Sequence, residues 1–487
     1  MSAHTSIRET LLVIESIDIS AAIANAEQQL QDDTQSSPAM KVSVSLLIMV
    51  IKLLLARLGI NSKNSSKPPS SDPNRKRTIR QPGTRKPGGQ IGHEGNALVP
   101  VSDPDIIRPL RIDRRSLPRG HYQAGGTEKR QVIDIEISRV ITEYQAEILI
   151  NEHGERYIAP FPAHITRPIQ YGPQFKAHAV YLSQYQLLTY KRIEEYFADQ
   201  LGVPVSAGSL VNFNREAAEK LVQLGAMEAI RSNLQAATVI HADETGLNIG
   251  GKRHWMHSVG NRHWTLLLPH AKRGRLAMDV MDVLPNFTGI LCHDHWKPYY
   301  QFTQCVHALC NAHHLRELEY AWEKDNQAWA KVLQSFLIQL HEKVEQEGGV
   351  LSNSKASYYR QRYRKLLQQA ELECPAPAPI KSSKKGKQAR SKSRNLLERL
   401  RDFEEDVLRF MVEKDVPFSN NQAENDIRMV KVQQKISGCF RSFSGAEWFC
   451  CIRSYLISCR KQDVSATMAL SMLFSGTLPE IFAPGAE

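Results

Sequence analysis

The first 60 residues carry an apolar pattern that is typical of helices. Within Val42–Ile60, apolar residues recur at spacings of three and four, at Leu46, Met49, Val50, Leu53 and Leu54. The same stretch contains Lys52 and Arg57, and a charge in the middle of a helix is costly in lipid, so we expect no membrane span. Two interpretations stay open: a helix that docks on the rest of this chain, or a short coiled-coil element that joins two copies.

Alternation of apolar and polar residues dominates the next patterned region. The runs 131–137 and 140–150 alternate in this way and are separated by glycine-containing turn signals from their neighbours. We therefore expect a small β-rich module over residues 100–171.

Helical periodicity returns over residues 172–235. The segment 192–220 predicts one helix, a turn through Gly202 and Pro204, and a second helix that begins near Ser206 or Ser209. This is the shape of a helix-turn-helix unit. Two helices with a tight turn also occur in many protein cores, so contact with DNA is one of two interpretations.

Strand and helix patterns alternate from residue 236 onward. A β-branched run opens a strand that contains Asp243, and Gly260-Asn261 predicts a hairpin turn. A buried strand ends on Asp294. The expected elements are strands at 237–248, 255–259, 262–268 and 287–294, a helix at 273–283, and further helices at 314–372 and 395–413. This order predicts an α/β domain with a helical insertion.

Two aspartates lie where such a domain binds ligands. Asp294 ends a strand, and ligand sites of α/β sheets lie at the carboxyl edge. Asp243 and Glu244 point to opposite faces of their strand, so only one can join the site, and we choose Asp243. Paired carboxylates suit Mg²⁺, and two such ions drive phosphodiester chemistry. Each aspartate alone could equally be a turn carboxylate.

A third carboxylate lies on a helix predicted to start after Ser419 or Asn420, both good N-caps. Glu424 shares a helix face with Arg428 and Lys431, which follow four and seven residues later. A carboxylate beside cations is what a metal site that holds a phosphodiester needs, although such a pair can also be a surface salt bridge. Lys435 and Arg441 extend this basic surface.

Composition points to a polyanionic partner. The 487 residues carry a formal net charge of +11 and are 42% hydrophobic, which suits a folded protein of about three structural units. Residues 61–90 hold eight basic residues against one acid, together with prolines and glycines. This stretch is either a solvated linker or a DNA contact through Lys63, Lys67, Arg75, Lys76 and Arg77. The basic tract 374–394 leaves the same two interpretations.

The eight cysteines all follow residue 291 and form no Cys-x-x-Cys pair. They indicate neither a disulfide framework nor a zinc ribbon and fit a reducing cytoplasm. The N-terminus has no pattern of a signal peptide, so we expect a cytoplasmic, nucleoid-associated bacterial protein.

Six stretches resemble the insertion-sequence-66 family of transposases. They are NSKNSSKPPSSD (61–72), KPGGQIGHEG (86–95), HADETG (241–246), HDHWKPY (293–299), CNAHHLREL (310–318) and NNQAENDIRMVKVQQKISGCFRS (420–442). The resemblance implies a DDE transposase with an RNase H-like catalytic domain, in which Asp243, Asp294 and Glu424 are the catalytic triad and bind two Mg²⁺ ions, for which Mn²⁺ can substitute. The long interval before Glu424 leaves room for the helical insertion.

The resemblance also implies the substrate and partners. Such an enzyme cleaves DNA at the terminal inverted repeats of an insertion sequence and transfers the strands to target DNA. We expect double-stranded DNA as partner, a homodimer or larger active complex, and small accessory proteins of the same element. The alternative is a catalytically degenerate, transposase-derived protein that only binds DNA.

Cysteine and histidine usage modifies this picture. Cys310 and His313 match the Cys-x-x-His element that follows the second aspartate in the family. Two residues alone make no tetrahedral zinc site, so we expect a structural hydrogen-bonding pair, with ligation of a metal as the alternative. Relatives usually carry a cysteine zinc finger after the KPGGQ-like stretch, where this chain has no cysteine. We therefore expect no zinc.

The expected organisation has six parts. They are a helical region (1–60), a basic linker (61–99), the β-rich module (100–171), a helical region with the helix-turn-helix shape (172–235), the catalytic domain (236–450) with its insertion at about 314–415, and a C-terminal helical region (451–487).

Overall fold

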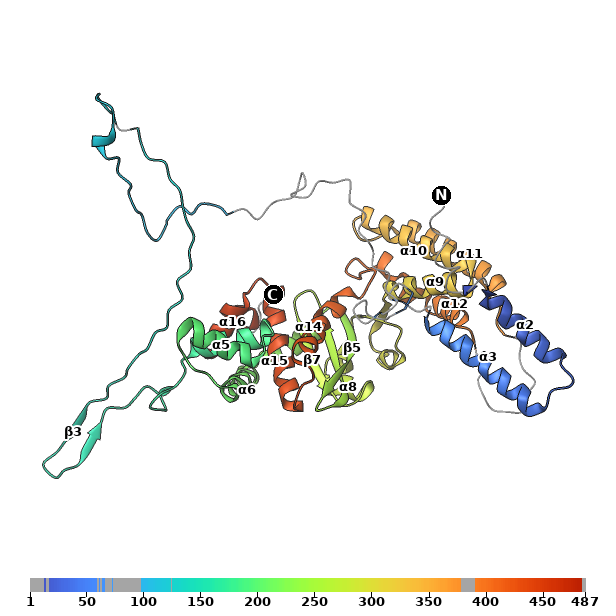
Figure 1. Cartoon of the computed structure of the whole chain (residues 1–487), viewed down its shortest axis with the longest axis horizontal. Helices are drawn as coiled ribbons and strands as arrows, with labels where there is room; N and C mark the ends of the chain where they lie inside the picture. Colours follow the sequence, from blue (N-terminus) through green and yellow to red (C-terminus); the bar gives the residue numbers. More distant parts are fainter. Residues whose placement is uncertain are drawn as a thin grey trace. The chain divides into compact units, whose positions relative to one another are not determined.

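The computed structural model describes residues 13–14, 17–58, 61, 64–65, 72, 98–123, 125–377 and 390–483 (Figure 1). The chain forms two compact units, the first of residues 1–75, 168–195 and 205–487, the second of residues 76–167 and 196–204. The five cations proposed for the basic linker, Lys63, Lys67, Arg75, Lys76 and Arg77, lie outside the described residues. The same is true of 378–389 in the second basic tract.

A five-stranded sheet forms the centre of the first unit, with strand order β7-β6-β5-β8-β9. The strands are β5 (Val239–Ile249), β6 (Lys252–Gly260), β7 (Thr265–His270), β8 (Ile290–His293) and β9 (Val306–Leu309). The first three strands pair antiparallel, whereas β5, β8 and β9 run parallel. The predicted α/β class is confirmed.

Turn chemistry explains the antiparallel part of the sheet. Gly250 and Gly251 join β5 to β6 with φ angles of +56° and +77°, which suits a two-residue hairpin turn that requires positive φ at both positions. The predicted hairpin after Gly260 is also present, since β6 ends there and β7 begins at Thr265. Helix α8 (Arg275–Met281) follows, as the sequence predicts.

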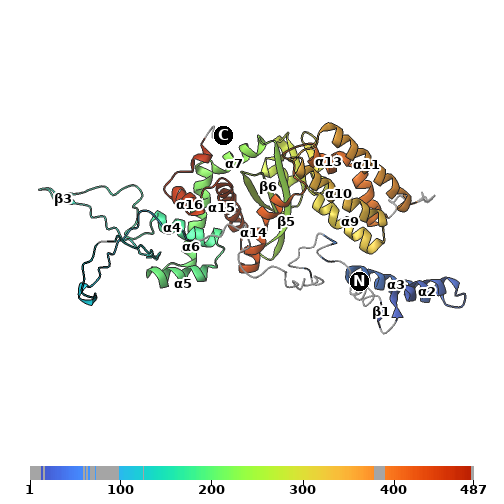
Figure 2. The same cartoon turned by 90° about the horizontal axis from the view of Figure 1, so that it is seen from above.

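Helices from both ends of the chain cover this sheet. Helix α14 packs on β5 and β6, and α15 packs on β7 and α6 (Figure 2). Their contacts bury a cluster that includes Leu247, Met256, Leu267, Val430 and Phe449. The helices that precede and follow the sheet and the insertion along the chain are α4 (Pro173–Val180), α5 (Tyr190–Leu201), α6 (Ala207–Gln223), α7 (Ala226–Gln235), α14 (Asn421–Ser437), α15 (Phe443–Lys461) and α16 (Ala466–Phe474), of which α7, α14 and α15 contact the strands.

The predicted helical insertion lies between β9 and α14. It consists of α9 (Asn311–Asp325), α10 (Ala328–Gln346), α11 (Asn353–Glu373), α12 (Lys392–Asp402) and α13 (Glu404–Leu408). Fully buried leucines and Tyr363 fill its core. Helix α13 packs on β9, and the Arg409 guanidinium donates to the His307 carbonyl at 2.7 Å. The insertion is therefore attached to the sheet edge next to β8.

The expected β-rich module differs from the structure. In the described part of residues 98–167, the only paired strands are β3 (Ile148–Ile150) and β4 (Arg156–Ile158), which form one hairpin. The strand prediction for 131–137 is wrong. Alternation marks a strand only when a second layer covers its apolar face, and here Val132 is 92% and Ile135 80% exposed.

Two helices form the described N-terminal region, α2 (Ile19–Asp32) and α3 (Pro38–Leu58). They pack on each other, and Lys52 of α3 forms an ion pair with Glu27 of α2 at 2.6 Å. Two-residue strands, β1 (Val13–Ile14) and β2 (Ile17–Asp18), precede them. Pro38–Leu55 is long and apolar enough to cross a membrane, which for a single helix is weak evidence of a span. Docking and dimerisation both stay predictions for α3.

Candidate active site

The fold brings the three predicted carboxylates to one edge of the sheet. In the parallel pair of β5 and β8, His241 lies opposite Cys292. Asp243 and Asp294 each follow two residues later, so they occupy equivalent positions on neighbouring chain segments. Glu424 lies in the first turn of α14, the helix that packs on β5.

Electrostatics shows that these carboxylates act on one another. Burial raises the pKa of Asp243 well above its usual value, and the charges of Glu244, Asp294 and Glu424 raise it further. Burial also raises the pKa of Asp294, while the Trp296 backbone N–H and the Arg273 charge act in the opposite direction. Negative charge is therefore crowded at this edge, and a cation would relieve it.

Glu244, the carboxylate that alternation excludes, has a different environment. The Tyr299 hydroxyl donates to Glu244 Oε2 at 2.6 Å, and Arg273 Nε donates to Oε1 at 2.9 Å. The Arg273 guanidinium also lies over Trp296 and Trp255, at 4.1 and 4.8 Å from the ring centroids. The buried Glu244 carboxylate is thus held by an ion pair with the exposed Arg273 and by Tyr299, which fixes the strand next to Asp243.

Asn420 joins three elements of the site. Its Nδ2 donates to the Ala242 carbonyl at 2.8 Å, its Oδ1 lies 2.8 Å from His241 Nδ1, and its backbone N–H donates to Cys310 Sγ at 3.1 Å. The residue occupies the N-cap position of α14, but its side chain makes no cap hydrogen bond. The expected capping role is therefore wrong for the side chain, which binds β5 instead.

Cys310 and His313 lie against Glu424. Among the residues that the structure describes, these three form the one group of metal-ligand side chains whose ligand atoms all lie within 4.8 Å of one another. Within the described residues, His313 Nδ1 is buried and has no hydrogen-bond partner. Burial lowers the pKa of His313 to about 4.

Cys310 and His313 are joined by a backbone hydrogen bond, and the expected hydrogen bond between their side chains is not formed. The His313 N–H donates to the Cys310 carbonyl at 3.2 Å, because both residues lie at the start of α9. The thiol sulfur accepts from Asn420 rather than from the imidazole. The side chains therefore meet at Glu424 and not through a bond between themselves.

The basic side chains of α14 divide into two groups. The first group is exposed and consists of Arg428 and Lys435 on the helix and Arg441 just after it. Lys431 is half-buried and donates to the Gly246 carbonyl of β5, and burial followed by the Arg253 charge lowers its pKa. Lys431 thus ties the helix to the sheet, whereas the other three face solvent.

Arginines of the insertion also approach the acidic edge, and the sequence interpretation missed them. Arg316 Nη2 lies 3.9 Å from Glu424 Oε1, and the charge of Arg399 partly opposes the burial that raises the pKa of Asp294. The Nε atoms of both arginines are buried without a hydrogen-bond partner in the described part of the chain. The one sequence signal was Arg316 within the CNAHHLREL stretch.

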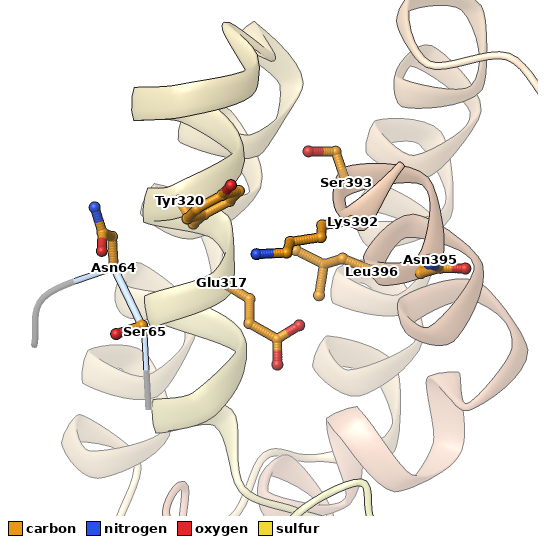
Figure 3. A pocket seen from close by; sticks show the side chains of 8 residues that line it. All are labelled: Asn64, Ser65, Glu317, Tyr320, Lys392, Ser393, Asn395 and Leu396. Atoms are coloured by element: carbon orange, nitrogen blue, oxygen red, sulfur yellow. The ribbon is translucent and has the colours of Figure 1, made fainter. Parts of the chain in front are cut away.

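Outside this edge, a pocket of about 310 Å³ lies between α9 and α12 (Figure 3). Lys392 Nζ lies 4.6 Å from the centre of the Tyr320 ring that lines it. Asn64 contributes to the wall and donates to Glu323 at 3.1 Å. Arg394 is buried and paired with Glu371 and Glu398. These described cations of the second basic tract stabilise the insertion.

The predicted helix-turn-helix elements are present as α5 and α6. Gly202 ends the first helix with φ +61°, and the Ser206 hydroxyl caps the second by accepting from the Ser209 N–H at 3.2 Å. The element prediction is confirmed. Contact with DNA stays a prediction.

The five-stranded sheet and the carboxylates at its edge define an α/β protein with an acidic centre bordered by basic side chains. A model of the Transposase IS66 family matches residues 168–448, more than half of the chain, and the chain belongs to this family. The resemblance is thereby confirmed, and with it a transposase role, a DNA-modifying activity and binding to DNA. Residues 9–98 match a family of unknown function (DUF6444). No curated protein matches the chain.

Proposed function

We propose that this transposase is a DDE enzyme that cleaves DNA at the terminal inverted repeats of its element and transfers the strands to target DNA. The observation that carries the proposal is the convergence of Asp243, Asp294 and Glu424. Both aspartates lie just beyond the parallel pairing of β5 and β8, and the charges of Asp294 and Glu424 act on Asp243. The mixed sheet with its aspartate in β5 and another after β8 supports an RNase H-like core for this chemistry.

The donor set fits Mg²⁺, with Mn²⁺ as a substitute. All three side chains offer carboxylate oxygens, which magnesium prefers. The raised pKa values of Asp243 and Asp294 mean that bound positive charge would stabilise their ionised forms. Two such ions, when bound, supply activation of a hydroxyl nucleophile and stabilisation of the leaving oxygen.

The protein's own residues position this centre and its DNA. Asn420 and the Glu244–Arg273 pair fix β5 on both sides of Asp243. Arg428, Lys435 and Arg441 hold phosphates near the acids, and contacts of this kind position DNA without reading its sequence. Lys431, which the sequence also assigns to DNA binding, ties α14 to β5 instead. Arg316 and Arg399 face the same edge from the insertion.

Partners follow from the same proposal. The element ends are held by the basic linker, including Lys63, Lys67, Arg75, Lys76 and Arg77, and by α5 and α6. The active complex contains two or more copies, together with accessory proteins of the element, and works in the bacterial cytoplasm at the nucleoid.

A cleavage assay tests the proposal. Duplexes that carry the element ends are incubated with the full chain and Mg²⁺, and nicked and joined products are resolved on denaturing gels. Asp243→Asn is expected to abolish cleavage and to leave end binding intact, while Asp402→Asn, an exposed carboxylate of the insertion, is expected to cleave like the wild type. End binding by the wild type without cleavage, with accessory proteins present, would favour the degenerate DNA-binding protein instead.

A further inference from the structure

We propose that Cys310, His313 and Glu424 form a binding site for one zinc-class transition-metal ion, separate from the Mg²⁺ pair and sharing Glu424 with it. The inference goes beyond the proposed function, because the site can bind metal whether or not the protein cuts DNA. It revises the sequence-based expectation that zinc has no role, and its ligands lie outside the part of the sequence where relatives carry the zinc finger.

Geometry brings the three ligands together from two helix starts. Cys310 is the N-cap of α9 and His313 lies in the first turn of that helix, three residues later, so both side chains lie on one side of it. Glu424 lies in the first turn of α14. Their ligand atoms are all within 4.8 Å of one another, and a side-chain adjustment of about 1 Å would bring them to the separations of about 3.5 Å that a tetrahedral ion with bonds of about 2.0–2.3 Å requires.

Hydrogen bonding around the cluster is incomplete in a way that a metal would complete. His313 Nδ1 is buried and has no partner in the described part of the chain. A buried polar atom without a partner costs about 1–3 kcal/mol, so native structures rarely keep one. A metal ion bound through Nδ1 would accept the lone pair of that nitrogen.

The thiol has the surroundings of a metal-bound sulfur. The Asn420 N–H donates to Cys310 Sγ at 3.1 Å, and outer hydrogen bonds of this kind orient metal ligands and tune their basicity. On binding, the S–H bond breaks, the proton leaves to solvent and the sulfur lone pair forms the metal bond, so no oxidant or reductant is needed.

Ligand chemistry selects the kind of ion. A thiolate and an imidazole favour zinc and its neighbours over magnesium, which prefers oxygen. Three protein ligands leave one position of a tetrahedral ion open, as in catalytic zinc sites. The Glu424 side chain is 38% exposed, so the cluster is accessible from solvent. The ion would also fix the rotamer of the third catalytic carboxylate.

Cobalt titration of the full chain tests this site. After treatment with a chelator, Co²⁺ is added as a spectroscopic substitute for zinc, and the thiolate-to-cobalt charge-transfer band and the visible bands of a tetrahedral ion are recorded. We expect one equivalent per chain, displaced by Zn²⁺. Loss of an outer-shell partner alone typically weakens metal binding about 10–100-fold, so Cys310→Ser should weaken it by about a hundredfold or more and abolish the charge-transfer band.

Two variants serve as controls. Cys439→Ser removes an exposed cysteine and should leave the band unchanged, as should Asp243→Asn, which alters only the Mg²⁺ centre. Circular dichroism checks that Cys310→Ser is folded, and His313→Gln provides a second loss of one ligand. A missing charge-transfer band in the wild type, or a band that both ligand variants retain, overturns the site. A normal band in a protein that cannot cleave DNA would refute only the transferase proposal.

Discussion

Asn420→Ala is the sharpest test of how the active-site edge is built. The side chain satisfies two buried groups of β5, the Ala242 carbonyl and the His241 imidazole, each at 2.8 Å. Strand β8 pairs with β5 only as far as His241, so the Ala242 carbonyl lies one residue beyond that pairing. Asn420 is 3% exposed, and water would not replace it freely.

The expected cost follows from these two groups. Each buried polar group left without a partner costs about 1–3 kcal/mol, so the substitution should destabilise the domain by about 2–6 kcal/mol. The first unit has about 390 residues, for which each kcal/mol shifts the melting temperature by about 1.2 °C, so we predict a loss of about 2–7 °C. The thermal transition is followed by circular dichroism at neutral pH.

The adjacent residue supplies a matched control. Asn421 is the same residue type, is exposed, and starts the same helix. Asn421→Ala should change the melting temperature by no more than about 1 °C, as is usual for surface substitutions. Equal shifts for the two variants would refute the role of Asn420 as the tie between α14 and β5.

Three further predictions concern charge. Lys461 Nζ lies 2.7 Å from Asp426 Oδ2, so Lys461→Met leaves Asp426 as a buried charge without its ion-pair partner. The substitution should lower the free energy of unfolding, measured by chemical denaturation, by about 3–5 kcal/mol. A loss of less than about 1 kcal/mol would contradict this. Because the pKa of Asp243 is raised, the folded state binds the proton of this carboxyl more tightly than the unfolded state does. Without divalent ions, the free energy of unfolding should therefore fall as the pH rises from the ordinary aspartate range toward neutrality. Asp243→Asn should flatten that fall in melting curves, and an unchanged slope would count against it. Arg428→Ala should reduce the slope of log affinity for DNA against log salt concentration by about one unit. Lys431→Met should leave this slope unchanged, since Lys431 already binds a backbone carbonyl. Fluorescence anisotropy at several salt concentrations measures the slope for both variants.

Local sequence patterns predicted correctly those helices and strands whose formation does not depend on contacts with distant parts of the chain. The strand that contains Asp243, the buried strand that ends at Asp294 and the helix that carries Glu424 all lie where periodicity and turn residues predict them. These signals depend on a few adjacent residues. Over 131–137 the same reasoning failed, because alternation describes a face that could be buried and says nothing about whether another layer covers it.

Roles that depend on distant partners could not be predicted in this way. Asn420 looks like a helix cap because it belongs to a residue type that caps helices, yet its side chain binds Ala242, 178 residues earlier. Lys431 looks like a phosphate ligand because of its charge, yet it binds the Gly246 carbonyl. Composition and spacing define what a side chain is able to do, and the tertiary fold decides which partner it meets.

Helix α14 shows why these distant contacts matter for the chemistry. It is tied to β5 by Asn420 at its N-cap and by Lys431 further along, and to α15 by the Asp426–Lys461 ion pair. Glu424 lies between these attachments, so its backbone cannot shift without breaking at least one of them. A carboxylate that must share an ion with two strand aspartates gains from such rigidity, since the energetic cost of positioning it is met during folding rather than at each turnover.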